Sequence, residues 1–385
     1  MSKRTFDFVV VGAGCFGAWT AYELACSGHS VLLLDAYGPA HSRASSGGES
    51  RVIRMGYGPD ELYTRWSVRS LERWKTLSGR IHQTVFHATG VLWFAGKGDT
   101  YTQESQETLE RVGVPHERLA VRELKSRYPQ ISHEDLEWAL WEPGSGILMA
   151  RRSVQALVED GIQFGLEYRV ARVVLPVPGT RSRLKSVVIT TGEYISSSKF
   201  IFACGAWLPK LFPDVLAERI FPTRQEVFFF GSSPGDPCFT YPAMPTWLDH
   251  GALVYGMPDL ENRGVKISVD RHGTSFDPDT GSRVPSAEGI SAAREYLEQR
   301  FPKLKGAPLC ESRICQYENT TNGDFLIDRH PELEDVFLVG GGSGHGFKHG
   351  PAVGEYVKQL LTDSGLLESR FSLAGKPNTK ARTVF

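Results

Sequence analysis

The sequence predicts a chain of mixed α/β and α+β class, in which a parallel-sheet domain is assembled from separated segments and an antiparallel sheet forms a second domain. Three observations predict this class. A complete strand, glycine turn, helix and strand unit opens the chain, short strands with turn residues fill the middle, and a second glycine-rich turn follows an apolar run near the carboxyl end. A length of 385 residues is also long for a single core, so two domains are expected.

The first unit has the order of a dinucleotide-binding, Rossmann-like motif. It consists of an apolar strand (6–11), Gly12, Gly14 and Gly17 in GxGxxG spacing, a helix (16–28), a second strand (30–34) and Asp35. Such glycines let the backbone approach a pyrophosphate, and the acid binds ribose hydroxyls. A chance glycine turn is the alternative, but the complete unit favours dinucleotide binding. The fingerprint does not separate FAD from NAD.

A polar loop, rich in glycine and serine, follows Asp35 and carries Arg51 and Arg54. One interpretation is a solvated loop with incidental charge. The other is a loop that wraps a ligand closely and presents an arginine fork to a carboxylate.

The middle of the chain predicts antiparallel strands within 83–96, 224–233 and 250–270, a helix at 152–165 and a buried strand at 199–207. In the stretch GVKISVD, alternation places Lys266, Ser268 and Asp270 on one face of a strand. That face is either exposed to solvent or directed at a site.

Two segments near the carboxyl end carry further candidates. Cys315 lies in ESRICQYENTTNGDFLIDRHP, where it is either a small core residue or a reactive thiolate that could attach a ligand. The second glycine turn, VFLVGGGSGHGFKHG, carries His345 and Lys348.

Composition narrows the function classes. The net charge of −1, from 43 basic and 44 acidic residues, gives no reason to expect nucleic acid or an anionic membrane as a partner. No apolar run is long enough to span a bilayer, and the start leaves no room for a signal peptide. Six scattered cysteines without CxxC spacing indicate neither a metal site nor a disulfide framework, so a cytoplasmic protein is expected.

These segments together resemble the monomeric sarcosine oxidase family, a branch of the D-amino acid oxidase-like flavoproteins. The blocks that carry the resemblance are VVVGAGCFG, LLLDAYGPAHS, SSGGESRVIRMGYG, YGMP with GVKISVD, RICQY, and FLIDRHP with GGGSGHGFK. They occur in order and cover nearly the whole chain. The resemblance implies an FAD-binding domain formed by 1–82, 145–220 and 318–385, and a substrate domain formed by 83–144 and 221–317.

The resemblance also implies roles for single residues. Arg51, Lys266 and His345 would act in catalysis, with Arg51 near the flavin ring and Lys266 activating O2. Arg54 and Lys348 would bind the substrate carboxylate, while Tyr255, Asp270 and Glu318 would line the substrate cavity. The implied FAD contacts are Gly12, Gly14, Cys15, Phe16, Gly17, Asp35, Ser45, Ser50, Arg51, Val173, Cys204, Gly205, Trp207, Cys315, Gly342, Gly344, His345, Gly346, Phe347 and Lys348. Cys315 would join the flavin covalently through a thioether.

The chain departs from the family pattern in three places. Asp270 stands where the family typically has histidine, Glu318 replaces a small hydroxyl residue, and Ser46 and Gly47 replace histidines. Added carboxylates imply a substrate that is larger, more polar or more cationic than sarcosine.

The resemblance therefore implies a monomeric enzyme that oxidises the C–N bond of a secondary or primary α-amino acid to an imine and reduces O2 to H2O2. Three alternatives stay open: a flavin dehydrogenase that uses another electron acceptor, an NAD(P) dehydrogenase, and a flavin-binding protein without turnover.

Overall fold

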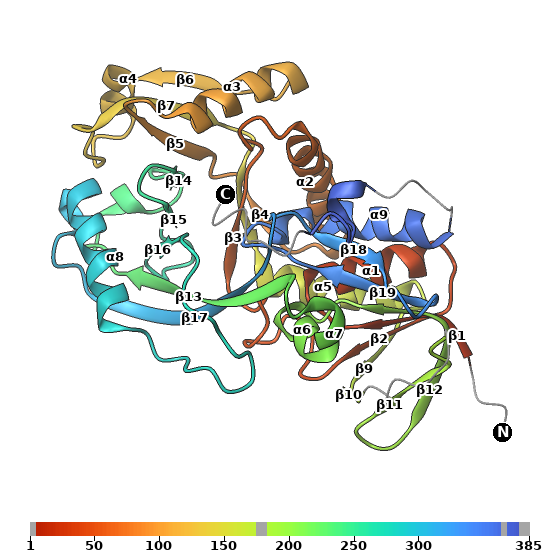
Figure 1. Ribbon diagram of the computed structural model, residues 1–385. Coiled ribbons are helices and arrows are strands. Elements are labelled where there is room, and N and C mark those ends of the chain that lie inside the picture. Colours follow the sequence, from red (N-terminus) through yellow and green to blue (C-terminus); the bar gives the residue numbers. More distant parts are fainter. Residues whose placement is uncertain (1–4, 175–182, 363–367, 377–385) are drawn as a thin grey trace.

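The computed structural model describes residues 5–174, 183–362 and 368–376 (Figure 1). Within these ranges the strands form three sheets. The first contains β1 (Thr5–Val11), β2 (Val31–Asp35), β9 (Glu167–Val170), β10 (Val173–Val174), β11 (Ser186–Ile189), β12 (Tyr194–Phe202), β18 (Leu326–Arg329) and β19 (Val336–Gly340). Because β1 runs parallel to β2 and β12, and β12 runs parallel to β19, segments far apart in the sequence meet in one sheet.

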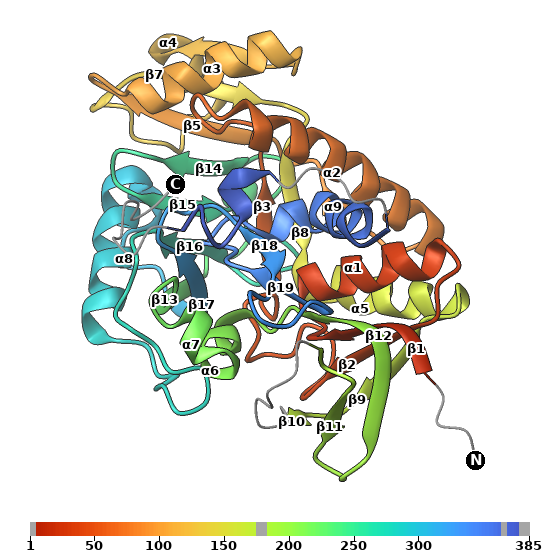
Figure 2. The same cartoon turned by 45° about the vertical axis from the view of Figure 1, so that its right-hand side comes forward.

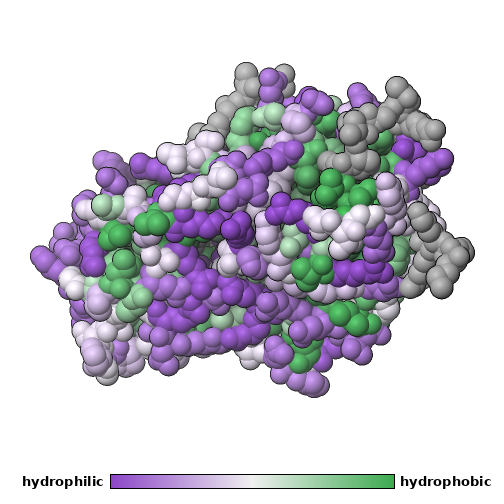
Figure 3. Space-filling model, turned by 90° about the horizontal axis from the view of Figure 1, so that it is seen from below, coloured by the Kyte–Doolittle hydropathy of each residue, from purple (hydrophilic) through white to green (hydrophobic). Residues whose placement is uncertain are grey.

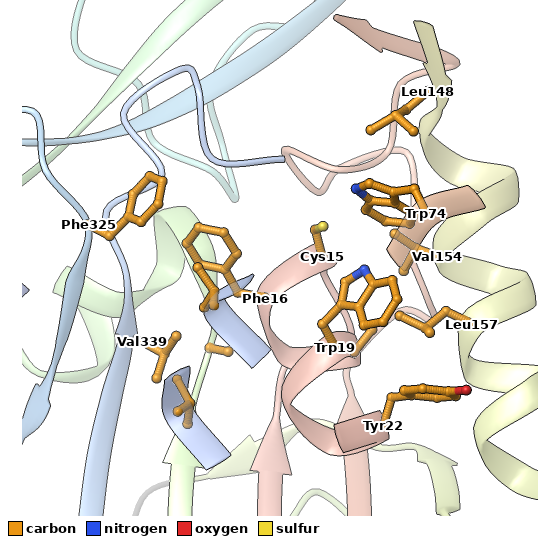
Figure 4. Close-up of a cluster of buried hydrophobic side chains, with 14 of the residues drawn as sticks. Cys15, Phe16, Trp19, Tyr22, Trp74, Leu148, Val154, Leu157, Phe325 and Val339 are labelled. Atoms are coloured by element: carbon orange, nitrogen blue, oxygen red, sulfur yellow. The ribbon is translucent and has the colours of Figure 1, made fainter. Parts of the chain in front are cut away.

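Helices cover one side of this sheet (Figure 2). They are α1 (Cys15–Cys26), α2 (Glu61–Ile81), α5 (Ala150–Gln163) and α9 (Gly350–Thr362). Helix α1 contacts both α5 and α9, and every residue of α1 before Cys26 is buried. Around it, Trp19 packs edge-to-face on Trp74 of α2 with ring centroids 5.0 Å apart, while Phe16 points toward Phe325 on the other side (Figure 4). This packing fixes the start of α1 beside the glycine turn.

The second sheet is antiparallel except for one pair. Its order is β17 (Leu309–Thr320), β13 (Ile220–Phe230), β16 (Val265–Val269), β15 (Val254–Met257), β14 (Thr246–Asp249), β5 (Val91–Gly96), β7 (Leu136–Glu142) and β6 (Glu117–Ala120), with β14 and β5 parallel. The helices of this part are α3 (Thr100–Val112), α4 (Val121–Arg127) and α8 (Ala287–Arg300). Two sheets of different kinds confirm the predicted mixed class.

A small third sheet lies between the two large ones (Figure 1). It joins β3 (Ser50–Ile53), β8 (Gly146–Met149) and β4 (Phe86–His87). Short helices α6 (Leu208–Leu211) and α7 (Pro213–Leu216) and the 3-10 turns Gly205–Trp207 and Phe347–His349 complete the surroundings of the site.

Some predicted elements were wrong at their ends. The first helix ends at Cys26, two residues early, and the strand predicted over 199–207 ends at Phe202. Gly205, at φ +54°, starts a 3-10 turn instead. Within the predicted stretch 83–96, the turn between β4 and β5 falls at Gly90, where φ is +66° and a Cβ atom would lie 1.8 Å from the Trp141 ring.

On the face shown in Figure 3, hydrophilic residues predominate and hydrophobic residues occur in separate groups among them. None of the helices in the described ranges combines the length and apolar character needed to cross a membrane.

Candidate functional site

A cavity opens at the carboxyl ends of β1, β2 and β12, where Val11, Asp35 and Ala203 belong to its lining. Ligands of open α/β sheets bind at this edge. The cavity brings together these residues of the predicted cofactor set: Gly12, Gly14, Cys15, Phe16, Asp35, Ser45, Arg51, Val173, Cys204, Gly205, Trp207, Cys315, Gly342, Gly344, Gly346 and Phe347. Gly17, Ser50, His345 and Lys348 lie outside this lining.

At two positions of the amino-terminal motif, Gly12 and Gly17, any side chain would clash with neighbouring backbone atoms. A Cβ atom at Gly12 would lie 2.3 Å from the Ala203 carbonyl oxygen, and φ at Gly12 is +107°. A Cβ atom at Gly17 would lie 1.9 Å from the Gly12 carbonyl oxygen. Gly17 therefore allows α1 to pack closely against the turn that follows β1, which explains why it does not face the cavity.

The amino end of α1 faces the cavity. Gly14 is its N-cap and offers no side-chain cap, while the Cys15 N–H donates to Ser46 Oγ at 3.0 Å. Ser46, where the family pattern has histidine, thus acts as a local acceptor. Histidine would not fit next to it, since a Cβ atom at Gly47 would lie 2.0 Å from the His41 carbonyl oxygen. A helix amino terminus of this kind stabilises phosphate charge.

Asp35 closes the other side of the turn. Its carboxylate accepts from the N–H groups of Ala13 at 2.7 Å, Tyr37 at 2.8 Å and Gly38 at 2.9 Å. The Tyr37 ring stacks on His41 with centroids 5.3 Å apart. Sequence reasoning missed both rings as cavity residues, although Tyr37 directly follows the acidic end of β2 and could have been found from that position.

Arg51 and Cys315 lie together on the cavity wall. Arg51 Nη1 donates to Ser50 O at 2.8 Å, and Nη2 donates to Ser45 O at 2.6 Å. The same Nη2 lies 3.6 Å from Cys315 Sγ. β3 supplies the arginine and β17 supplies the cysteine, so a positively charged group stands beside the thiol.

Lys266 lies on β16 and is only 2% exposed, so of the two alternatives for this polar face, exposure to solvent does not hold for this residue. Its amine donates to Ser50 O at 2.7 Å and lies 3.3 Å from Ser50 Oγ. Burial and the nearby Arg51 charge hold the pKa of Lys266 well below its usual range. The Tyr255 ring centroid is 6.0 Å from the amine.

Arg54 and Lys348 are buried basic side chains that share one neighbour, Tyr57. The Arg54 guanidinium lies 4.2 Å from the Tyr57 ring centroid and 4.9 Å from that of Trp93, and it donates to Gly56 O. Lys348 Nζ donates to Tyr57 Oη at 2.8 Å and to the carbonyl oxygen of His345 at 3.0 Å. Burial, followed by the Arg54 charge, lowers the pKa of Lys348 well below its usual range.

His345 is not part of the cavity lining, and its ring contacts Tyr57, Gly323 and Phe325 instead. Its Nδ1 lies 3.2 Å from Tyr57 Oη and its Nε2 lies 3.2 Å from Gly323 O. The ring also stacks on Phe325 with centroids 4.8 Å apart. His349, which sequence reasoning missed, places Nε2 2.7 Å from the same Tyr57 hydroxyl.

The two unusual carboxyl groups lie in different places. Asp270 accepts a 2.7 Å hydrogen bond from the Tyr317 hydroxyl. Burial raises its pKa to about 6, against the opposing effect of Tyr317, Arg54 and Lys348. Glu318, in contrast, belongs to the cavity lining with the cofactor residues. The sequence grouped both with the substrate.

The lining fits a dinucleotide. Two buried polar atoms on it, Ser45 Oγ and Glu318 Oε2, have no hydrogen-bond partner among the described residues, and the amino end of α1 adds backbone donors. A phosphate- and hydroxyl-bearing ligand supplies the missing partners. The same described ranges contain no group of three or more His, Cys, Asp or Glu side chains that could hold a metal ion.

Comparison with known proteins agrees with this chemistry. The family model described as FAD dependent oxidoreductase (DAO) matches residues 7–360. The chain is 33% identical over 363 residues to monomeric sarcosine oxidase of Bacillus sp. (strain NS-129), covering 93% of each protein. It is 31% identical over 396 residues to human peroxisomal sarcosine oxidase, covering 97% of this chain and 98% of that protein.

A solved structure shares the fold. L-proline dehydrogenase from P. horikoshii superimposes with a TM-score of 0.84 over 97% of this chain and 98% of that chain, at 21% identity. The resemblance found in the sequence is thereby confirmed. The chain belongs to the DAO family of FAD-dependent oxidoreductases, among relatives that are named as oxidases of amino acids.

Proposed function

We propose that this enzyme oxidises the C–N bond of a secondary or primary α-amino acid to an imine and reduces O2 to H2O2. The observation that carries the proposal is the pair of buried basic side chains Arg54 and Lys348. Their hydrogen bonds go to Gly56, Tyr57 and His345, so within the described residues neither side chain donates to a carboxylate, while Asp270 and Glu142 lie close enough to attract positive charge there. A substrate carboxylate would neutralise this charge and be held in one orientation.

FAD, when bound, supplies the hydride acceptor and the site of O2 reduction. The chain would hold its pyrophosphate at Gly12, Gly14 and the amino end of α1, and its ribose at Asp35. The wall formed by Arg51, Cys315 and the turn from Gly342 to Phe347 would face the flavin ring.

Cys315 is proposed as the covalent attachment point through a thioether. The support is the position of its thiol on the cavity wall, 3.6 Å from Nη2 of the Arg51 guanidinium.

Lys266 is proposed to assist the reaction with O2. It is a buried amine next to the strand that carries Arg51, and it presents positive charge or a hydrogen-bond donor where negative charge develops on oxygen. His345 is proposed to hold Tyr57 in place behind the carboxylate-binding pair, because its ring contacts the Tyr57 hydroxyl.

Asp270 is proposed to set the substrate class. Its carboxyl, held by Tyr317, adds negative charge near Arg54 and Lys348. This arrangement favours an amino acid with a polar or cationic side chain, which places its carboxylate at the cations and its second positive group at Asp270.

Anaerobic mixing of the yellow protein with a panel of amino acids tests the substrate class. The panel contains sarcosine, other N-methyl amino acids, pipecolate and fructosyl amino acids, with neutral and cationic side chains. Loss of flavin absorbance is expected with α-amino acids and fastest with polar or cationic side chains. A protein whose flavin stays oxidised with every member contradicts the proposal.

A further inference from the structure

Glu318 is a buried carboxyl on the wall of the cofactor cavity, only 9% exposed. Its Oε1 accepts from the Gly342 N–H at 3.3 Å, whereas Oε2 has no hydrogen-bond partner among the described residues. A Cβ atom added to Gly205 would lie 3.7 Å from Glu318 Oε2, and one added to Gly340 would lie 3.2 Å from the same oxygen. The carboxyl therefore lies close to two glycines, one in the 3-10 turn Gly205–Trp207 and one at the end of β19, where no side chain intervenes. A buried polar atom of this kind needs a partner from the ligand.

The position of Glu318 points to a specific part of the ligand. Gly342, which donates to Glu318, is packed against Gly346, where a Cβ atom would lie 2.9 Å from the Gly342 Cα. Gly346 in turn faces the Phe16 ring in the first turn of α1. Since a helix amino end of this kind holds pyrophosphate, the neighbouring ligand atoms are those of the pyrophosphate and the ribityl chain next to it.

Few charged groups lie near Glu318 to favour or oppose its ionisation. Its neighbour on β17 is Tyr317, and the residue paired with it on β13 is Pro222. The titratable residue next to it from the segment before Gly205 is Cys204. The loop after β19 contributes only backbone N–H groups, of Gly342 and Gly341.

The other charged and titratable residues of the cavity lining are Cys15, Asp35, Tyr37, His41, Arg51, Arg172 and Cys315. No described lysine or arginine forms an ion pair with Glu318, and burial raises the pKa of its carboxyl to about 7.

We propose that Glu318 binds FAD in its neutral form, donating a hydrogen bond from Oε2 to an oxygen of the ribityl or pyrophosphate segment, so that FAD binding takes up a proton. An ionised carboxylate would repel the two phosphate charges, and the burial of Glu318 would strengthen this repulsion. The neutral form removes this repulsion and turns an unpartnered acceptor into a donor. The inference rests on the assignment of the cavity to FAD and is independent of the substrate.

Titration calorimetry with FAD tests the inference on the full-length apoprotein carrying Cys315→Ala, which keeps the cofactor exchangeable. Measurements in two buffers with different ionisation enthalpies give the number of protons taken up. About half a proton is expected at pH 7 and nearly one at pH 8.5. Because Glu318 ionises in the free protein as the pH rises and must be protonated again for FAD to bind, FAD affinity should fall about 30-fold between pH 6 and pH 8.5.

Glu318→Gln in the same background keeps a donor but cannot ionise, so its affinity should stay nearly constant and its proton uptake should vanish. Glu318→Ser, a smaller replacement, should also lose the uptake. Asp270→Asn is the matched control, because it removes the other carboxyl with a raised pKa and should leave the uptake intact.

The outcomes separate this inference from the cofactor assignment. FAD binding without proton uptake, or uptake that persists in Glu318→Gln and Glu318→Ser, overturns the role of Glu318 and leaves the cofactor site standing. Failure of the parent apoprotein to bind FAD overturns both.

Discussion

The amine of Lys266 donates a hydrogen bond to the carbonyl oxygen of Ser50 at 2.7 Å, although 216 positions separate the two residues. This contact joins β16 of the antiparallel sheet to β3, the strand that also carries Arg51. The second large sheet thus places a buried amine against the strand whose Arg51 lines the cavity.

Lys266→Met should slow the reaction of the reduced flavin with O2 by about 100-fold, because the substitution removes the buried group that would stabilise developing negative charge. Reduction by substrate without O2 should change much less. Stopped-flow reoxidation measures the effect. Lys75→Met, an exposed lysine on α2, is the control, and equal reoxidation rates in both variants would refute the role of Lys266.

Cys315→Ala should release the flavin from acid-precipitated protein, whereas the parent precipitate should stay yellow. The reason is that Cys315 Sγ is the thiol on the cavity wall beside Arg51. Absorbance of the supernatant measures the release. Cys310→Ala, on the same strand but exposed, should behave as the parent does. Free flavin from the precipitated parent would show that no covalent bond exists.

Arg54→Gln should raise KM for amino acid substrates about 10- to 100-fold, since hydrogen bonds to charged groups are worth roughly 1.5–3 kcal/mol. Turnover of the corresponding amine without a carboxylate should be affected far less. Steady-state kinetics with both substrates measures the difference. Arg65→Gln, on the exposed face of α2, is the matched control. An equal loss for both substrates would contradict a carboxylate-binding role.

Binding of cationic side chains should weaken as pH falls through about 6. The pKa of Asp270 is raised to about 6 by burial, so its carboxyl is charged above that pH and neutral below it. In kcat/KM profiles, Asp270→Asn should lose this acidic limb for cationic substrates and change little for neutral ones. A limb of the same position and size in Asp270→Asn would assign it to another group.

Glu142→Ala should destabilise the fold by about 2–5 kcal/mol, because it leaves several buried donors without an acceptor. The Glu142 carboxylate accepts from Met55 N, Gly56 N, Trp93 Nε1 and Ser145 Oγ at 2.5–3.0 Å and is 1% exposed. Denaturant unfolding measures the loss. Glu137→Ala, exposed on the same strand, should shift stability by less than about 0.5 kcal/mol. Similar values for the two variants would show that this network contributes little.

The sequence was most informative where its signal is local. The amino-terminal βαβ unit could be predicted because hydrophobic runs, glycine spacing and Asp35 all lie within about 30 residues of each other. Element ends were less certain. The strand that ends at Phe202 was extended to 207, because the apolar run continues into a turn that depends on the positive φ of Gly205.

The site itself depends on contacts between distant segments. Alternation placed Lys266 and Asp270 on one face of a strand, but it carried no information about what covers that face. Glu318 was grouped with Asp270 on the basis of a sequence pattern. In the structure, Glu318 accepts from the Gly342 N–H and lines the cofactor cavity, whereas Asp270 accepts from the Tyr317 hydroxyl and is not part of that lining. The Tyr57 hydroxyl, which contacts Lys348, His345 and His349, was missed because those partners lie almost 300 residues later.

Peroxide release is the most direct test of the central claim. The amino acid that reduces the flavin fastest without O2 should, in air, yield one H2O2 for each imine formed and each O2 consumed. An oxygen electrode and a coupled peroxide assay measure the ratio. Rapid reduction of the flavin without peroxide, or with turnover only on addition of another electron acceptor, would contradict the oxidase assignment and indicate a dehydrogenase.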